Sequence, residues 1–450
     1  MTAPINEFVK KYSEKKTVRF HMPGHKGVKF HGLEALDITE IKGADYLFEP
    51  DGIIAESEKK MSKAFGTAET LYSTEGSSLC IKTMLGLIKY RKGNPDSQPI
   101  IVASRNCHKA FINACALLDI CVKWVYPSKK STSVCSSNIT PADIENAVKS
   151  CEKTPDAVYV TSPDYLGNMC DIKGISQVCK RYGTILLTDN AHGAYLHFLP
   201  ENLHPIALGA DMCCDSAHKT LPCYTGGALL HISENAPEIF KEKSRLIMSM
   251  FASTSPSYLI MQSLDLCAEY VSGKFSNELL KTIERVNLCK KRIAQNGWNV
   301  LSGSRTEPMK ITVNANLSGL TGNELAEQLR KFNIEPEYSD FQYLTLMPST
   351  FNTEEDFCIF EKATAEIPHT GHLVYTEYAE IPYPKIRTSI RKAAFSPSHC
   401  VPINEAEGMI CGLTVTTCQP SVPVVVSGEE ITADVIKILK SYSIFHINVL

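Results

Sequence analysis

The chain has 450 residues, of which 46 are Lys or Arg and 49 are Asp or Glu, so its formal charge is −3. This near balance does not favour nucleic acid or an anionic membrane surface, and it makes small molecules the expected partners. The length suggests two or three structural units, and 44% hydrophobic residues suffice for a large core, which excludes disordered and collagen-like proteins.

The N-terminal residues 1–16 carry charges where a signal peptide needs an apolar stretch, and no run of about 18 apolar residues occurs. We therefore expect a soluble, cytoplasmic protein. Seventeen cysteines with irregular spacing and no CxxC pair fit a reducing compartment. Cys213 and Cys214 lie in an apolar, strand-like stretch where they act as small hydrophobes, so no metal site is expected.

From about residue 53 to 240, helical patterns alternate with short apolar runs, which predicts an α/β fold around a mainly parallel sheet. Each run is bounded by Gly, Pro, Asn or Ser. The predicted helices cover residues 53–65, 78–90, 108–118 and 142–151. The predicted strands cover residues 100–103, 122–126, 157–161, 185–188, 211–214 and 228–232.

The C-terminal part has a different order of elements. A long helical pattern over residues 258–296, ending at Gly297, is typical of a connector between domains. The residues beyond it predict a smaller α+β domain. Its expected elements are the strand-like MKITVNA and FQYLTLMP, a helix over 324–331, a helix after Asn352 and a terminal helix in ITADVIKILKSYSIF. The expected domains are residues 1–52, 53–300 and 301–450.

Lys219, in the motif SAHKTLP (216–222), follows the strand-like DMCC. Open α/β sheets bind ligands at the carboxyl ends of their strands, so this lysine is a candidate ligand-binding residue. An exposed loop lysine is the plain alternative, although Ser216 and His218 add a hydroxyl and an imidazole beside it.

Asp189 ends the strand-like TILL in the motif DNAHGA (189–194). A carboxylate there suits a protonated ring nitrogen, or it forms an ordinary turn. The motif STEGSS (73–78) precedes a helix, and its Gly, its hydroxyls and the helix N-terminus together suit a phosphate, with an ordinary Ser cap as the alternative.

Two histidines lie in other loop-like motifs. His108, in RNCHK (105–109), can stack on a flat cofactor or cap the helix that begins there. His25 lies in HMPGHKG (21–27), whose HxxxH spacing resembles a zinc helix, but the Pro and Gly within it argue against a helix and leave a binding loop.

The chain closely resembles the ornithine/lysine/arginine decarboxylase family. The motifs that carry the resemblance are SAHKTLP, DNAHGA, RNCHK and STSPSY, with FHMPGHKG near residue 20 and SGEE near residue 430. The chain resembles the short form of this family, without the N-terminal wing domain. The resemblance implies pyridoxal 5'-phosphate as cofactor and the aspartate aminotransferase fold (fold type I), with a large α/β domain and a smaller C-terminal α+β domain.

By this resemblance Lys219 binds the cofactor covalently, Asp189 pairs with the ring nitrogen and His108 stacks on the ring. Either Lys219 or His218 returns a proton to the α-carbon. The stretch STSPSY implies a homodimer, because it resembles the family's segment that reaches the neighbouring subunit's cofactor. The remaining implied cofactor contacts are Gly76, Ser77, Ser78, Ala191, His192, Ser216, Ser253 and Thr254.

The resemblance also implies the substrate. Glu429 matches the family acid expected to face the distal cation of a basic amino acid, and His25 is the second expected substrate contact. The expected reaction is decarboxylation of arginine, or else lysine or ornithine, to the amine and carbon dioxide, as in polyamine biosynthesis. The alternatives are a fold type I aminotransferase or carbon–sulfur lyase, and a catalytically silent regulatory homologue.

The chain departs from the usual family pattern at three places. It has Asn190 where the family usually has Glu in DEAH, and Glu75-Gly76-Ser77-Ser78 in place of an NGTS-type loop. The usual PYPPGIP followed by PGE is replaced by TCQPSVP (417–423) and then SGE (427–429). The last change lies beside Glu429 and therefore bears on substrate identity.

Overall fold

The computed structural model describes residues 3–15, 17–126, 133–136, 139–369, 382–417 and 422–450. The chain divides into two compact units. The first unit comprises Met1–Pro99, Asp156–Tyr159 and Ile172–Ser276, and the second comprises Ile100–Pro155, Val160–Asp171 and Asn277–Leu450. The domain limits expected from the sequence stay a prediction.

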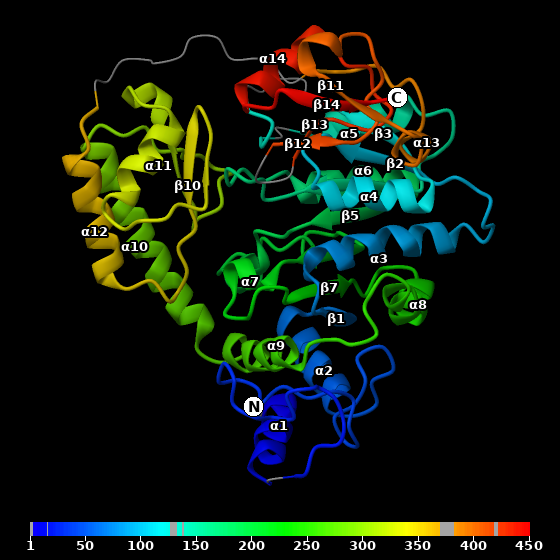
Figure 1. Ribbon diagram of the computed structural model, residues 1–450, viewed down its shortest axis with the longest axis vertical. Helices are drawn as coiled ribbons and strands as arrows, with labels where there is room; N and C mark the ends of the chain where they lie inside the picture. The colour runs from blue at the N-terminus through cyan, green and yellow to red at the C-terminus, as the bar shows by residue number, and fades with distance from the viewer. Residues whose placement is uncertain (1–2, 16, 127–132, 137–138, 370–381, 418–421) are drawn as a thin grey trace. The chain divides into compact units, whose positions relative to one another are not determined.

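A seven-stranded sheet has the strand order β1-β7-β6-β5-β4-β2-β3. Figure 1 labels β1, β5 and β7 of the first unit and β2 and β3 of the second. In the first unit β5 and β6 are parallel, with Asp189 opposite Cys214, whereas β7 is antiparallel to both β6 and β1. In the second unit β2 and β3 are parallel. The strands are β1 (Glu69–Ser73), β2 (Ile100–Ser104), β3 (Cys121–Val125), β4 (Ala157–Thr161), β5 (Ile185–Asp189), β6 (Met212–Asp215) and β7 (Ala228–Ile232).

The helices of the first unit pack by their apolar faces. Helix α3 is buried along most of its length and contacts β6, β7 and α8, whereas α1, α2 and α9 pack together. Helix α2 ends at the predicted residue 65, and the following Gly66 takes a left-handed conformation. The elements are α1 (Pro4–Glu14), α2 (Ile53–Phe65), α3 (Gly76–Arg91), α6 (Ile172–Tyr182), η1 (Ala194–Phe198), α7 (Ala217–Thr220), α8 (Glu238–Ser249) and α9 (Tyr258–Val271).

The second unit adds two apolar clusters to its strands. One is formed by α10, α11, α12 and the sheet β8-β10-β9, and the other by α14 and the C-terminal strands. Helix α10 begins in the first unit and continues in the second. The elements are α4 (Lys109–Leu118), α5 (Pro141–Lys149), α10 (Phe275–Gln295), β8 (Ile311–Asn314), η2 (Ala315–Ser318), α11 (Gly322–Arg330), β9 (Tyr338–Ser339), β10 (Tyr343–Leu346), α12 (Glu354–Glu366), α13 (Ile390–Ala394), β11 (His399–Pro402), η3 (Ile403–Glu405), β12 (Val415–Thr416), β13 (Pro423–Val425), α14 (Ala433–Ser441) and β14 (His446–Val449).

The prediction of one long helix over residues 258–296 is wrong. Helix α9 ends at Val271 and α10 begins at Phe275, with Gly273 in the turn between them. Glycine disfavours helix interiors because it loses the most backbone entropy on folding, and the helical pattern of the flanking residues concealed that break. The predicted terminal helix is shorter than its motif, since α14 stops at Ser441 and β14 follows.

Two general features bear on the sequence predictions. Within the described ranges no helix is long and apolar enough to cross a bilayer. None of the cysteines in that part of the chain forms a disulfide, and burial raises the pKa of the Cys213 and Cys214 thiols well above the usual range. These two thiols therefore stay protonated, in keeping with their expected packing role.

Candidate active site

Lys219 lies in the short helix α7, which follows β6 directly. Its Nζ is 3.0 Å from Nε2 of His192, which comes from the loop after β5. The sequence predicted the two residues from separate motifs, and the structure brings them together within the first unit. An imidazole at this distance can accept a proton from the lysine ammonium group.

Asp189 ends β5 and its carboxylate is buried. It accepts hydrogen bonds from the Tyr159 hydroxyl at 3.1 Å, the Cys214 thiol at 3.6 Å and the Ala191 backbone N–H at 3.2 Å. Donors on both oxygens fix the orientation of the carboxylate. Tyr159 was not predicted as a site residue, because nothing in the sequence of β4 distinguishes it from a core tyrosine.

The loop before α3 has the features expected of an anion site. Helix α3 begins at Gly76, and its N-cap Glu75 makes no capping hydrogen bond with its side chain. Ser77 and Ser78 therefore lie in the first turn, so the alternative of an ordinary Ser cap is wrong. The Ser77 hydroxyl accepts a hydrogen bond from the Ser216 hydroxyl at 2.8 Å.

Gly76 shapes the start of that helix. Its φ is +70°, a conformation that favours glycine, and a Cβ there would meet no atom within 4 Å. Its N–H donates to the carbonyl of Gly226 at 2.7 Å. The turn is thus held to the start of β7, with open space in front of the glycine.

His218 and Ser253 are held by neighbours in the first unit. The Nδ1 of His218 lies 2.9 Å from the carbonyl of Gly227, so this nitrogen carries a proton and donates it. The backbone N–H of Ser253 donates to the Glu75 carboxylate at 2.7 Å. Ser253 and Thr254 themselves are exposed.

His108 belongs to the second unit and caps α4. Its Nδ1 accepts a hydrogen bond from the Ala110 N–H at 3.1 Å, which confirms the capping interpretation. The stacking role that the resemblance implies stays a prediction.

Glu429 also belongs to the second unit, and its carboxylate is paired within the chain. Arg105 donates to it at 2.9 Å and the Val426 N–H at 2.7 Å, and both partners of the ion pair are buried. Burial raises the pKa of Glu429, and the charge of Arg105 opposes this rise. Its second oxygen, Oε1, has no hydrogen-bond partner among the described residues.

His25 donates and accepts within its own loop. Its Nδ1 accepts the Gly27 N–H at 3.0 Å, so Nε2 carries the proton that faces Asp37 at 3.2 Å. Its predicted contact with substrate stays a prediction. In the altered motif TCQPSVP, residues 418–421 lie outside the described part of the chain.

Comparisons with known proteins identify the family of the chain. The sequence model of the Orn/Lys/Arg decarboxylase major domain matches residues 3–312. An arginine decarboxylase of Bacillus subtilis is 28% identical, over 96% of this chain and 91% of the relative.

Solved structures match in fold. A lysine decarboxylase of Francisella novicida superimposes with a TM-score of 0.83 at 18% identity, covering all of this chain and 81% of the other. The constitutive lysine decarboxylase of Escherichia coli gives 0.79 at 16% identity, over 100% and 82% of the two chains. These likenesses confirm the predicted fold type I architecture, and with the match over residues 3–312 they place the chain in the ornithine/lysine/arginine decarboxylase family.

Proposed function

We propose that this protein is a pyridoxal-phosphate-dependent decarboxylase of a basic L-amino acid, with arginine as the first choice and lysine or ornithine next. One observation carries the proposal: three features lie in the same unit of a family member. They are Lys219 after β6, the buried Asp189 at the end of β5 and the uncapped N-terminus of α3. The products are the amine and carbon dioxide.

The residues present fit the cofactor. The Ser77 and Ser216 hydroxyls, 2.8 Å apart beside an uncapped helix N-terminus, suit its phosphate, and the open space before Gly76 leaves room for it. Asp189 suits a protonated ring nitrogen, and Lys219 suits the aldehyde carbon. Ser78, Ala191, His192 and His108 are the further proposed contacts.

Each of these side chains has a physical task. When bound, pyridoxal phosphate supplies the conjugated ring that accepts the electron pair released as carbon dioxide leaves. Asp189, oriented by its three donors, keeps the proton on the ring nitrogen through its negative charge. His192, at 3.0 Å, takes a proton from the Lys219 ammonium so that the lysine can act as a nucleophile.

The substrate assignment rests on a relative and on the surroundings of Glu429. The name of the B. subtilis relative supports arginine. The Oε1 of Glu429 has no hydrogen-bond partner among the described residues, which supports a contact with a cationic group, with His25 as a second proposed contact. Arg105 already occupies the other oxygen of Glu429, and a planar guanidinium can direct an N–H at the remaining oxygen, whereas an ammonium acts as a point charge.

The direct test is the release of carbon dioxide and amine from arginine, lysine and ornithine with added pyridoxal phosphate. We expect release from arginine above the other two, and none from Lys219→Ala. A keto acid in place of the amine would identify an aminotransferase and contradict the proposal. Bound cofactor without turnover of any of the three would point to another substrate or to the lyase alternative.

We further infer a homodimer as the minimal catalytic unit and a role in polyamine biosynthesis in the cytoplasm. The exposed position of Ser253 and Thr254 supports the dimer, because residues that serve a neighbouring subunit must reach the surface of their own. The absence of disulfides among the described cysteines fits a reducing compartment.

A further inference from the structure

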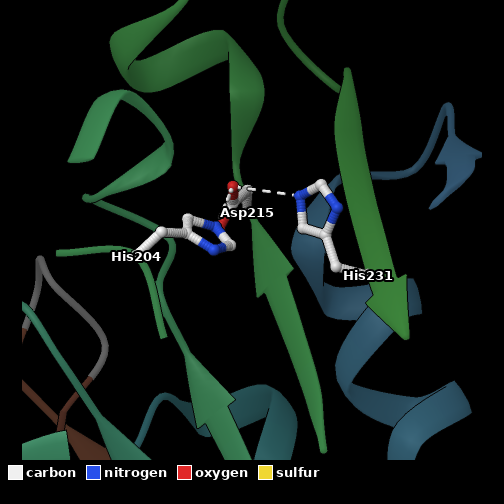
Figure 2. A group of neighbouring side chains, drawn as sticks. All are labelled: His204, Asp215 and His231. Atoms are coloured by element: carbon white, nitrogen blue, oxygen red, sulfur yellow. Dashed lines mark hydrogen bonds and ion pairs between the residues drawn. The ribbon is translucent and has the colours of Figure 1, made fainter. Parts of the chain in front are cut away.

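A buried polar cluster lies at the ends of β5, β6 and β7, beside the proposed cofactor site. It consists of Asp215, His204, His231, Cys213 and Asn190, none of which is among the predicted site residues. Figure 2 shows the Asp215 carboxylate between the two imidazoles, with His231 projecting from β7. Asp215, His204 and His231 are completely buried.

The Asp215 carboxylate accepts four hydrogen bonds. His204 and His231 each approach Oδ2 through Nε2 at 3.1 Å, whereas the Asn190 amide reaches Oδ1 at 2.7 Å and the Cys213 thiol reaches it at 3.5 Å. A carboxylate offers about four lone-pair positions, so this one is saturated. A buried group with four donors and no further acceptor nearby is stable only as the anion.

Because the Asp215 carboxylate only accepts, each histidine donates to it through Nε2. The Ile206 N–H donates to Nδ1 of His204 at 3.4 Å, which leaves the proton on Nε2, facing Asp215. The Thr70 hydroxyl lies 2.9 Å from Nδ1 of His231 and can donate to it. Burial lowers the pKa of His231. Burial alone would raise the pKa of the Asp215 carboxyl, but the two imidazoles outweigh this effect and hold that pKa well below its usual range.

This arrangement also decides against a metal ion in the cluster. His204, Asp215 and His231 offer ligand atoms within 4.8 Å of one another. A metal ion on Nε2 of His204 would force the ring proton onto Nδ1, where the Ile206 N–H already points. The three residues form a hydrogen-bonded network instead.

The cluster connects directly to both halves of the cofactor site. Asn190 follows Asp189, and its own N–H donates to the Cys214 carbonyl at 2.9 Å. Asp215 precedes Ser216, whose hydroxyl contacts Ser77. Because side chains alternate along a strand, Asp215 and Asn190 meet on one face while Cys214 and Asp189 meet on the other.

We propose that Asp215 is a positioning residue for the cofactor. Its saturated carboxylate fixes Asn190 and the turn at Ser216. It thereby sets the positions of Asp189 and of the Ser77–Ser216 pair. The proposal rests on the proposed function, since it concerns the same cofactor. It also accounts for Asn190, where the family usually has Glu, because a second carboxylate at 190 would face an ionised Asp215 with no donor between them.

The test compares Asp215→Asn with Asp265→Asn, another aspartate buried in the first unit, whose partners are Ser57 and Asn6. Pyridoxal phosphate is titrated into each apo-protein, the absorbance spectrum of the bound cofactor is followed against pH, and thermal unfolding of the apo-proteins is recorded. We expect Asp215→Asn to weaken cofactor affinity about tenfold or more, because the loss of one hydrogen bond to a charged group has an effect of this size. We also expect it to shift the pH midpoint of the spectrum. Asp265→Asn leaves both unchanged.

Two further variants keep the test decisive. Asn190→Ala removes the same contact from the other side and carries the test if Asp215→Asn does not fold, with the same direction of change expected. Asn190→Glu should weaken cofactor affinity more in the wild-type chain than in Asp215→Asn, because the repulsion needs both carboxylates.

The outcomes separate the two proposals. A wild-type chain that binds no pyridoxal phosphate overturns the proposed function itself. Normal binding by the wild type, with the same affinity and spectrum in Asp215→Asn or Asn190→Ala, overturns only the positioning role. Equal changes in Asp265→Asn also overturn it, since the effect would then be one of general stability.

Discussion

Glu429 is the residue whose surroundings differ most from its expected role. The sequence predicts an acid that faces substrate, whereas the structure pairs its carboxylate with the buried guanidinium of Arg105. The Cζ of that guanidinium lies 5.0 Å from the centroid of the Trp124 ring, which adds a cation–π contact. Glu429 is therefore part of the interior of the second unit whether or not it also binds substrate.

The pair makes a stability prediction. Glu429→Gln leaves the Arg105 charge buried without its partner, and breaking a buried pair in this way costs about 3–5 kcal/mol. We expect a loss of that order in the free energy of unfolding, measured by denaturant titration. The neighbouring Glu430→Gln is the matched control, because its pair with Arg387 is half-exposed and worth below about 1 kcal/mol. Equal losses in the two variants would contradict the account.

Sequence patterns predicted single residues well where a motif joined several polar groups. SAHKTLP and DNAHGA identified Lys219 and His192, which the structure places 3.0 Å apart. They did not identify His204 or His231, because each stands alone among apolar neighbours and its partner, Asp215, lies in a different segment, at the end of β6. Contacts between strands are set by register, which a single sequence does not display.

Helix α3 links the fold to the site at the scale of one element. Gly76 opens the helix at φ +70° with free space around it, whereas Gly86 lies in its middle, where a Cβ would stand 2.6 Å from the Ile247 side chain. One glycine is required by backbone conformation and the other by close packing against α8. Substituting each by alanine therefore separates two effects within the same helix.

Gly76→Ala strains the backbone by roughly 1–2 kcal/mol and disturbs the N–H groups that would face a phosphate. We expect weaker pyridoxal phosphate binding in a titration of the apo-protein. Gly86→Ala overpacks the contact with α8 and should lower stability by roughly 1–3 kcal/mol with unchanged cofactor affinity. A cofactor affinity reduced equally in both variants would show that α3 acts only through overall stability.

Most elements follow from local pattern, as the agreement of α2 with its predicted bounds of 53–65 illustrates. The α9–α10 break escaped prediction because one glycine weakens a helix without always ending it. Strands β1 and β14 escaped it as well, since each lies beside a helix in the sequence and owes its conformation to a distant antiparallel partner, β7 or β11.

At the scale of the whole molecule, the proposed shared site makes a prediction about pairs of chains. Thr254 is exposed, so Thr254→Arg should fold normally but block a neighbouring subunit's site. We expect this variant and Lys219→Ala each to lack activity alone. Co-expression should restore activity, because a mixed dimer contains one site with both Lys219 and Thr254 intact. Activity that fails to return from a purified mixed dimer would indicate sites built from one chain.

The contact between Asn190 and Asp215 restricts the order in which these two positions can change during evolution. Starting from this chain, a change of Asn190 to the Glu that the family usually carries would place two carboxylates face to face, unless position 215 had already lost its charge. Lineages that descend from this protein should therefore replace Asp215 before they replace Asn190, and the two positions should vary together rather than independently.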